Sequence, residues 1–226
     1  MPTMPETTLH PSGFPGSPGS PESRGPLSVR SVGQAELPAF YAMLARAFED
    51  DPVSEYLFPA AGSRLRRLDA FYRAMMGSMA AHGRMDTTER LEGGAIWQAP
   101  NPPRPDALYV ISMMLRSALQ LRGRVRAGLE LGRRLEVVHE HRPHWYLAML
   151  GTEPRCQGMG VGSALISSVL SRCDEAGELA YLESSKEVNL RFYQRHGFEV
   201  QQEVQIPDGP VMWAILREPQ PSAAVG

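Results

Sequence analysis

Along the chain after residue 26, apolar side chains either alternate or recur at helical spacing, and this pattern predicts the elements. Residues 27–32 alternate and predict a strand. Residues 34–48 and 63–82 carry apolar side chains three and four positions apart, which predicts two amphipathic helices. Two short apolar runs, 84–88 and 93–99, predict a hairpin that ends at a proline-rich segment.

The second half of the chain alternates between helical and strand patterns. Residues 106–140 are helical in pattern, with one apolar stripe before and another after a break near Gly123. The remaining predicted elements are a strand over 145–151, a helix over 161–176, a strand over 179–183, a short helix over 189–196, and strands over 198–206 and 211–216.

The two ends of the chain lack this periodicity. Residues 1–25 are rich in Pro, Gly and Ser, and such a segment buries too little apolar surface to offset its ordering entropy, so we expect a disordered tail. Residues 219–226 are expected to be frayed. We therefore predict one domain over 26–218, with a helical insert at about 104–142.

Composition narrows the functional class. The net charge of −2 gives no electrostatic case for binding nucleic acid or an anionic membrane. Two cysteines make neither a disulfide framework nor a zinc site. No apolar run reaches the length of a membrane span, and no basic-then-apolar signal opens the chain. We expect a soluble, cytoplasmic protein; its oligomeric state is not indicated.

The most informative segment is the glycine-rich turn from Gln157 to Gly162, between a predicted strand and a predicted helix. Such a turn presents backbone N–H groups at the positive end of a helix dipole, which suits a phosphate. Ser163 stands where a Rossmann fingerprint needs its third glycine, and a Walker loop needs a lysine that this turn lacks. A methyltransferase turn fits better, with Glu183 at the place of a ribose-binding acid. The chain after Gly162 is, however, short for a doubly wound sheet.

Two polar clusters suggest metal binding less strongly than other roles. Asp50-Asp51-Pro52 follows a predicted helix, and we interpret these acids as a solvated helix end. The segment His139–His144 contains three histidines but no HExxH pattern and no second ligand cluster. We therefore predict no metal, and expect instead a catalytic or substrate-facing role for one of His144, Glu140 or His139, at the mouth of a strand.

Two motifs resemble those of the GCN5-related N-acetyltransferase (GNAT) superfamily. Gln157-Gly158-Met159-Gly160-Val161-Gly162 matches its Gln/Arg-x-x-Gly-x-Gly/Ala signature, and the segment from Asn189 to Phe198 matches its Asn-x4-Tyr-x3-Gly-Phe signature. A closer likeness, to puromycin N-acetyltransferase-like members, runs from about Val29 to Arg217 and includes the Pro207-Asp208-Gly209-Pro210 turn. The resemblance implies an α/β fold with a mixed, largely antiparallel sheet of about six to seven strands flanked by helices, with the helical insert before the fourth strand.

The resemblance also implies acetyl-CoA as co-substrate and a set of residues that contact it. The glycine turn would hold the pyrophosphate, a splayed strand edge would pair with the pantetheine arm, and Asn189 would hydrogen-bond its amides. The cofactor residues expected on these grounds are Leu150, Gly151, Thr152, Gln157, Gly158, Met159, Gly160, Val161, Gly162, Ser163 and Asn189.

The chemistry of acetyl transfer then assigns roles. Tyr193, four residues after Asn189 on the same helix, is the expected general acid for the departing thiolate. Glu183, Glu140 and His144 are candidate bases, and Tyr72 is a candidate for the acceptor pocket. We predict an N-acetyltransferase that moves acetyl to a small-molecule amine by direct attack in a ternary complex, with antibiotic resistance as a possible purpose. The alternatives are a degenerate CoA-binding sensor or partner module and, third, a SAM-dependent methyltransferase.

Overall fold

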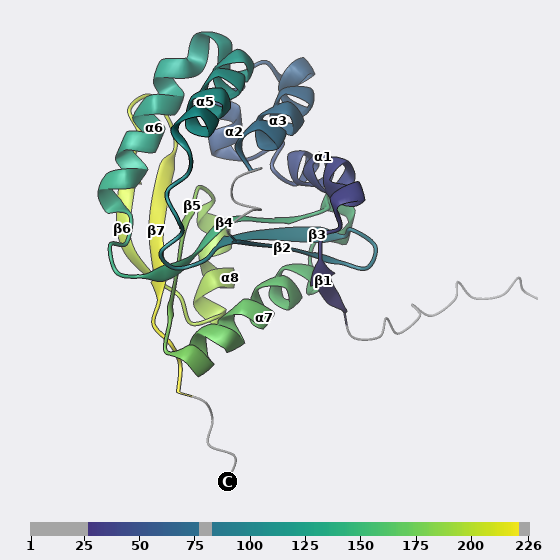
Figure 1. The fold of residues 1–226 in the computed structure, drawn as a ribbon, viewed down its shortest axis with the longest axis vertical. Coiled ribbons are helices and arrows are strands. Elements are labelled where there is room, and N and C mark those ends of the chain that lie inside the picture. The colour runs from purple at the N-terminus through teal and green to yellow at the C-terminus, as the bar shows by residue number, and fades with distance from the viewer. Residues whose placement is uncertain (1–26, 77–82, 222–226) are drawn as a thin grey trace, which may run out of the picture.

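The computed structural model describes residues 27–76 and 83–221, and a seven-stranded mixed sheet runs through them (Figure 1). Its strand order is β1-β2-β3-β4-β5-β7-β6, and β4 and β5 are the parallel pair; the other neighbours are antiparallel. The predicted fold class is confirmed. The strands are β1 (Val29–Ser31), β2 (Gly83–Thr88), β3 (Gly93–Gln98), β4 (His144–Thr152), β5 (Leu179–Ser184), β6 (Glu199–Gln205) and β7 (Val211–Arg217).

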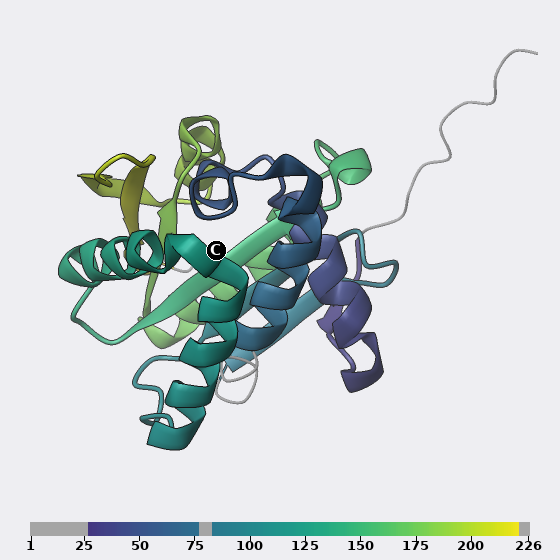
Figure 2. The same ribbon diagram turned by 90° about the horizontal axis from the view of Figure 1, so that it is seen from above.

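Helices cover both faces of the sheet (Figures 1 and 2). One face carries α1 (Leu37–Ala47), α2 (Pro52–Leu57), α3 (Ala61–Met75), α5 (Ala107–Leu121) and α6 (Val125–Val138), packed around one apolar core. The other face carries α7 (Val161–Ala176) and α8 (Leu190–Arg195), packed around a second core. Short 3-10 turns lie at Gln34–Glu36 (η1), Arg122–Arg124 (η2), Pro154–Cys156 (η3) and Glu187–Asn189 (η4).

Glycines bring α1 and α7 close to the middle strands. A Cβ on Gly94 would lie 2.2 Å from the Phe40 ring of α1, and one on Gly93 would lie 2.6 Å from Val161 of α7. A Cβ on Gly151 of β4 would lie 2.9 Å from Leu44. Real Cβ atoms do not approach so closely, so these positions require glycine for the helices to pack at this distance.

The parallel pair of strands separates partway along its length, and this creates the site. Cα pairing between β4 and β5 covers His144 to Tyr146 on β4 and Leu179 to Tyr181 on β5. Beyond Tyr146, β4 continues to Thr152 while pairing with β3 alone among the described strands, and it carries a register shift opposite Ile96 and Trp97. The β5-facing edge of β4 is therefore open to another backbone or to a ligand.

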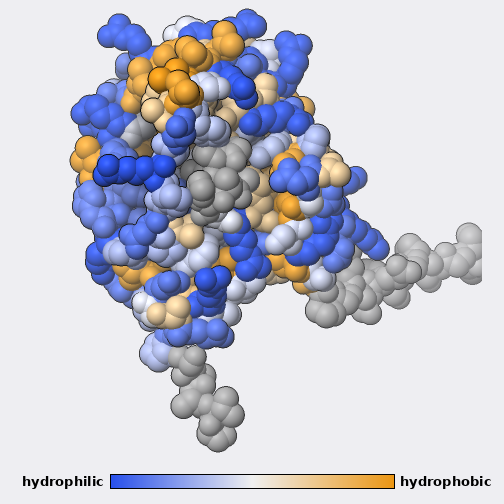
Figure 3. Space-filling model, in the orientation of Figure 1, coloured by the Kyte–Doolittle hydropathy of each residue, from blue (hydrophilic) through white to orange (hydrophobic). Residues whose placement is uncertain are grey.

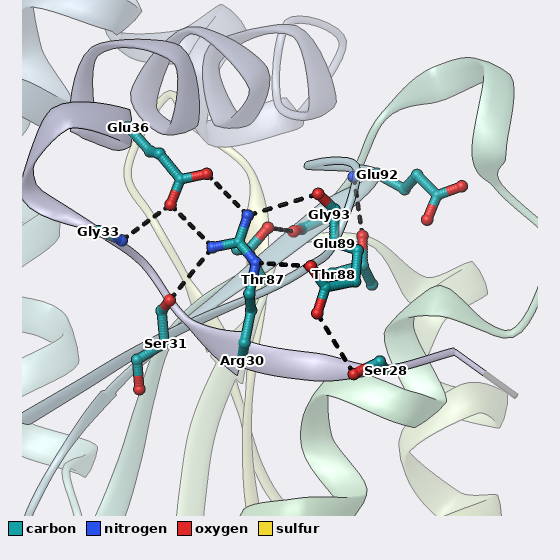
Figure 4. A network of polar contacts seen from close by, with 10 residues as sticks. All are labelled: Ser28, Arg30, Ser31, Gly33, Glu36, Thr87, Thr88, Glu89, Glu92 and Gly93. Atoms are coloured by element: carbon teal, nitrogen blue, oxygen red, sulfur yellow. Dashed lines mark hydrogen bonds and ion pairs between the residues drawn. The ribbon is translucent and has the colours of Figure 1, made fainter.

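A network of polar contacts ties the first strand to the β2–β3 hairpin (Figure 4). The Arg30 guanidinium donates to both carboxylate oxygens of Glu36, at 2.7 Å each, and also to Glu89 at 3.2 Å. The backbone N–H of Gly33 donates to Glu36 at 3.0 Å. These contacts lower the pKa of Glu36 to about 2, with the Arg30 hydrogen bond as the largest cause. β1 has only three residues, Val29–Ser31, and so makes few ladder hydrogen bonds with β2. This network therefore helps to hold β1 at the edge of the sheet.

Two predictions about helices need correction. Residues 52–57 form a helix, α2, because Pro52 suits the first helical position and the carboxylate of Asp51 accepts a hydrogen bond from the Val53 N–H at 2.9 Å. Asp51 is 6% exposed, so its interpretation as a solvated helix end was wrong; Asp50 is solvated, with its side chain 83% exposed.

The apolar stripe predicted in the insert also behaves differently from a core stripe. The break near Gly123 is confirmed as η2 between α5 and α6. Most of the α5 stripe, however, faces outward, and Figure 3 shows apolar residues gathered over this helix. The exposed members are Leu108, Ile111, Met114, Leu115 and Leu119. The predicted tail 1–25, the end of the helix predicted over 63–82, and residues 222–226 lie outside the described residues.

Candidate active site

A cleft of about 610 Å³ lies at the open edge of β4. Four segments wall it: the junction of α1 and α2, the last residues of β4, the glycine turn before α7, and the segment from Lys186 into α8. Nearly all of the residues expected to contact a cofactor line this one cleft. They are Leu150, Gly151, Thr152, Gln157, Gly158, Gly160, Val161, Gly162, Ser163 and Asn189. Met159, in contrast, is not among the lining residues and is 48% exposed.

The glycine turn presents the start of α7 to this cleft. Gly158 and Gly160 have φ angles of 76° and 80°, in the left-handed region that side chains other than glycine rarely adopt. Gly160 is the N-cap of α7, and no side chain caps the helix there; its first turn carries no acidic residue. The first N–H groups of a 16-residue helix are therefore left for a ligand in the cleft.

Tyr193 and Asn189 also meet at the cleft. Asn189 ends η4 and is the N-cap of α8, and Tyr193 lies within α8, so both line the same wall. Tyr193 is 8% exposed and packs against Phe198 with ring centroids 5.8 Å apart. Burial, and secondarily the charge of Asp51, raise the pKa of the Tyr193 hydroxyl well above its ordinary value. The hydroxyl is therefore protonated at neutral pH.

Glu183 lies on the opposite face of β5 from Tyr193. Its neighbour Leu182 belongs to the core that contains Tyr193, and successive side chains of a strand point to opposite faces. The Glu183 side chain is 4% exposed, and its carboxylate lies 3.3 Å from Nδ1 of His139. That hydrogen bond raises the pKa of His139, more than burial lowers it. Glu183 is thus held in a buried pair and is absent from the cleft lining.

The other two candidate bases line a second, smaller cavity of about 200 Å³. Glu140 accepts a hydrogen bond from Arg142 at 2.8 Å, and this contact lowers the pKa of Glu140 to about 2. The Nδ1 atom of His144 lies 2.7 Å from the carbonyl oxygen of Arg142, and burial lowers the pKa of His144. Its ring centroid lies 5.0 Å from that of His139. The structure therefore separates these residues from the glycine turn.

Tyr72, the candidate for the acceptor pocket, is a core residue. It is 7% exposed, its ring centroid lies 6.3 Å from that of Phe48, and it is not among the residues that line the cleft. Burial raises the pKa of its hydroxyl above the ordinary value. Phe48, one residue after α1, takes the lining position instead.

Sequence reasoning missed Asp51 and the two residues that follow β5. Asp51 lines the cleft, and Ser185 donates a hydrogen bond from Oγ to its Oδ2. Lys186 also lines the cleft and pairs with Asp50 at 2.7 Å. The local signal for Asp51 was its place before Pro52, which is typical of a helix N-cap.

In 27–76 and 83–221 there is no group of three or more His, Cys, Asp or Glu side chains arranged to hold a metal ion, and the absence of a metal stays a prediction. Of the helices within these ranges, none combines the length and apolar character that a membrane crossing requires.

Comparison with known proteins agrees with this architecture. Residues 94–198 match the model of the Acetyltransferase (GNAT) family. This matched range includes β4, the glycine turn and α8. A Corynebacterium glutamicum structure titled as histone acetyltransferase HPA2 and related acetyltransferase is 23% identical, with a TM-score of 0.61 over 88% of this chain and 99% of that one.

Two other solved structures share the fold at lower identity. Arylalkylamine N-acetyltransferase 2 from Aedes aegypti is 10% identical, with a TM-score of 0.59 over 87% of this chain and 100% of that one. An agmatine N-acetyltransferase variant in its apo form is 15% identical, with a TM-score of 0.55 over 85% of this chain and 99% of that one. Such identities establish likeness of fold. The match to the Acetyltransferase (GNAT) family model over residues 94–198 agrees with that likeness.

Proposed function

We propose that this protein is an N-acetyltransferase that moves the acetyl group of acetyl-CoA to an amine of a small molecule, by direct attack in a ternary complex. One observation carries the proposal: the uncapped glycine turn, the open edge of β4 and the buried Tyr193 line the same cleft. The pyrophosphate, the pantetheine arm and the thioester of acetyl-CoA would therefore each face a suitable part of one cleft: the glycine turn, the edge of β4 and Tyr193, respectively.

Different parts of the cleft contact different parts of acetyl-CoA in this proposal. The N–H groups of Gly158 to Gly162 bind the pyrophosphate, because they lie uncapped at the positive end of α7. The edge of β4 from Leu150 to Thr152 pairs with the pantetheine amides as a neighbouring strand would. Asn189 supplies a side-chain amide on the facing wall. When bound, acetyl-CoA supplies an activated acyl carbon and a thiol leaving group.

Tyr193 then protonates the leaving thiolate. A free thiol has a pKa of about 8.5, well below that of a buried tyrosine, so the hydroxyl first stabilises the departing thiolate by donating a hydrogen bond to it. The proton then passes to sulfur as the nitrogen loses a proton that restores the hydroxyl. General acid catalysis of this kind contributes about 10²- to 10⁴-fold to a rate. Tyr193 is suited to the role because its hydroxyl is protonated and it lies on the wall that also carries Asn189.

The sequence likeness to puromycin N-acetyltransferase-like members suggests the first acceptors to test. The segments that carry that likeness include His141-Arg142-Pro143 and Phe192-Tyr193. We therefore propose aminonucleosides, together with arylalkylamines and polyamines, as the opening panel. If the protein acetylates aminonucleosides, we propose that it protects its host from drugs of that class.

The test is release of free thiol from acetyl-CoA, measured with each amine of the panel and corrected for hydrolysis without acceptor. The proposal expects amine-dependent thiol release and an N-acetylated product by mass spectrometry. Acetyl-CoA binding without thiol release on any amine would favour the degenerate sensor, and binding of S-adenosylmethionine in its place would favour the methyltransferase. An O-acetylated product would overturn the assignment to amines.

A further inference from the structure

Asp51 is a buried carboxylate on the wall of the main cleft. It is 6% exposed and is the N-cap residue of α2, where its Oδ1 accepts a hydrogen bond from the Val53 N–H at 2.9 Å. Its Oδ2 accepts from the Ser185 hydroxyl, which lies just past the end of β5. The side chain is thus fixed by two elements that are far apart in sequence.

The surroundings of Asp51 differ from those of a structural ion pair. The nearby cation, Lys186, pairs with Asp50 at 2.7 Å. The groups around Asp51 from other elements are Tyr72 of α3, Tyr193 of α8 and Lys186 after β5. Burial is the largest influence and raises the pKa of Asp51, while Ser185, the Val53 N–H and Lys186 lower it. The carboxylate is a stronger base than an exposed aspartate.

The contacts of Asp51 leave room for a further donor. A carboxylate offers about four lone-pair sites. Backbone N–H groups of Val53 and Ser54 and the Ser185 hydroxyl engage three of them. Because Asp51 lines the cleft, an ammonium group in the cleft reaches it without crossing the core.

We propose that Asp51 binds the ammonium form of the acceptor amine and takes its proton, so that it is the general base of the reaction; this rests on the acetyl-transfer function proposed above. Asp51 and Tyr193 then serve as base and acid within one cleft, near enough for the charge of Asp51 to perturb the hydroxyl. Ser185 is a positioning residue that orients the carboxylate.

The proton and electron balance closes with these two groups. Asp51 takes one proton from the ammonium and releases it to water after turnover. The neutral nitrogen forms a bond to the acyl carbon, and the C–S bond breaks with its electron pair leaving on sulfur. The Tyr193 hydroxyl protonates that sulfur, and the second nitrogen proton, lost as the amide forms, restores the hydroxyl through water.

The rival assignment is Glu183, the candidate base from the sequence. Its carboxylate is paired with His139 and lies on the opposite face of β5 from Tyr193. Glu140, the other acid considered, has its pKa lowered to about 2 by Arg142, which makes it a weak base. Asp51 is the acid that combines burial, a raised pKa and a place on the cleft wall.

The test compares Asp51→Asn with wild type on two acceptors, the fastest alkylamine of the panel and hydroxylamine, which is mostly unprotonated at neutral pH. Asparagine keeps the N-cap of α2 and removes the basic oxygen. We expect kcat on the alkylamine to fall by about 10²-fold or more, and the deficit to shrink as pH approaches the solution pKa of that amine. On hydroxylamine we expect the variant to match wild type.

Asp106→Asn is the matched control, because Asp106 caps α5 through the Leu108 and Tyr109 N–H groups and lies outside the cleft lining. We expect it to keep wild-type rates. If wild type neither binds nor turns over acetyl-CoA, the proposed function fails. If wild type is active and Asp51→Asn keeps full alkylamine turnover, or loses equally on both acceptors, the base assignment alone is overturned. A full rate in Asp51→Asn with a lost rate in Glu183→Gln would move the base to Glu183.

Discussion

The glycine turn and the opposite end of the same helix provide a matched pair of substitutions. Gly160 and Gly177 are the N-cap and C-cap residues of α7, with φ angles of 80° and 67°. An added Cβ would meet no heavy atom within 4 Å at either position. The backbone cost of a valine is therefore similar at both, while Gly160 lines the cleft and Gly177 does not.

The magnitudes follow from this geometry. A non-glycine residue in the left-handed region costs about 1–2 kcal/mol, and for a protein of this size each kcal/mol lowers Tm by about 2–4 °C. We expect Gly160→Val and Gly177→Val to lose similar thermal stability. A side chain at Gly160 also stands between the α7 N–H groups and a pyrophosphate. Losing one hydrogen bond to a charged group costs about 1.5–3 kcal/mol, so Kd for acetyl-CoA should rise by about 10- to 100-fold or more.

The assay is titration calorimetry of acetyl-CoA below the Tm of both variants, with scanning calorimetry of the free proteins. The expected result is a loss of affinity in Gly160→Val and wild-type affinity in Gly177→Val. Equal affinities in the two variants, whether both weakened or both intact, would refute the reasoning that the turn holds the phosphates.

Three further predictions concern single groups. Tyr193→Phe should lower kcat by about 10²-fold or more and leave Kd for acetyl-CoA nearly unchanged; unchanged turnover removes its acid role. His139 should titrate above 6.5 by NMR and shift downward in Glu183→Gln, because the Glu183 carboxylate raises its pKa; an unshifted His139 contradicts the pairing. Burial raises the pKa of Asp51 above 3.8, so wild type loses stability as pH rises through that raised pKa. Asparagine does not titrate, so the Tm of Asp51→Asn relative to wild type should rise with pH; a relative Tm that falls with rising pH would count against burial as the cause.

Much of the fold and of the cleft wall was predictable because local sequence determines it. The turn from Gln157 to Gly162 combines glycines that tolerate positive φ with an apolar helical pattern directly after it, and both signals are local. The α8 segment is equally local, since Asn189 and Tyr193 are one helical turn apart. The mixed character of the sheet was expected from the family resemblance, and its strand order was not predicted, because strand spacing alone does not determine which strands pair.

The placement of the acidic residues considered as bases was less predictable, because tertiary packing determines it. Alternation along β5 puts Leu182 and Glu183 on opposite faces, but the sequence did not indicate which face carries the cleft. Asp51 is buried by contacts with Ser185, 134 positions away, and no local pattern reports such a contact. The α5 stripe shows the opposite failure. Its amphipathic pattern was local and clear and predicted a buried apolar face, but most of that face is exposed among the described residues.

We propose that the cleft beside β4 binds acetyl-CoA and presents its thioester to Tyr193. The most direct measurement is a titration of the protein with acetyl-CoA, CoA and S-adenosylmethionine, followed by thiol release with the amine panel. We expect binding of acetyl-CoA and CoA, no binding of S-adenosylmethionine, and thiol release that depends on an amine. A protein that binds neither acetyl-CoA nor CoA would contradict it.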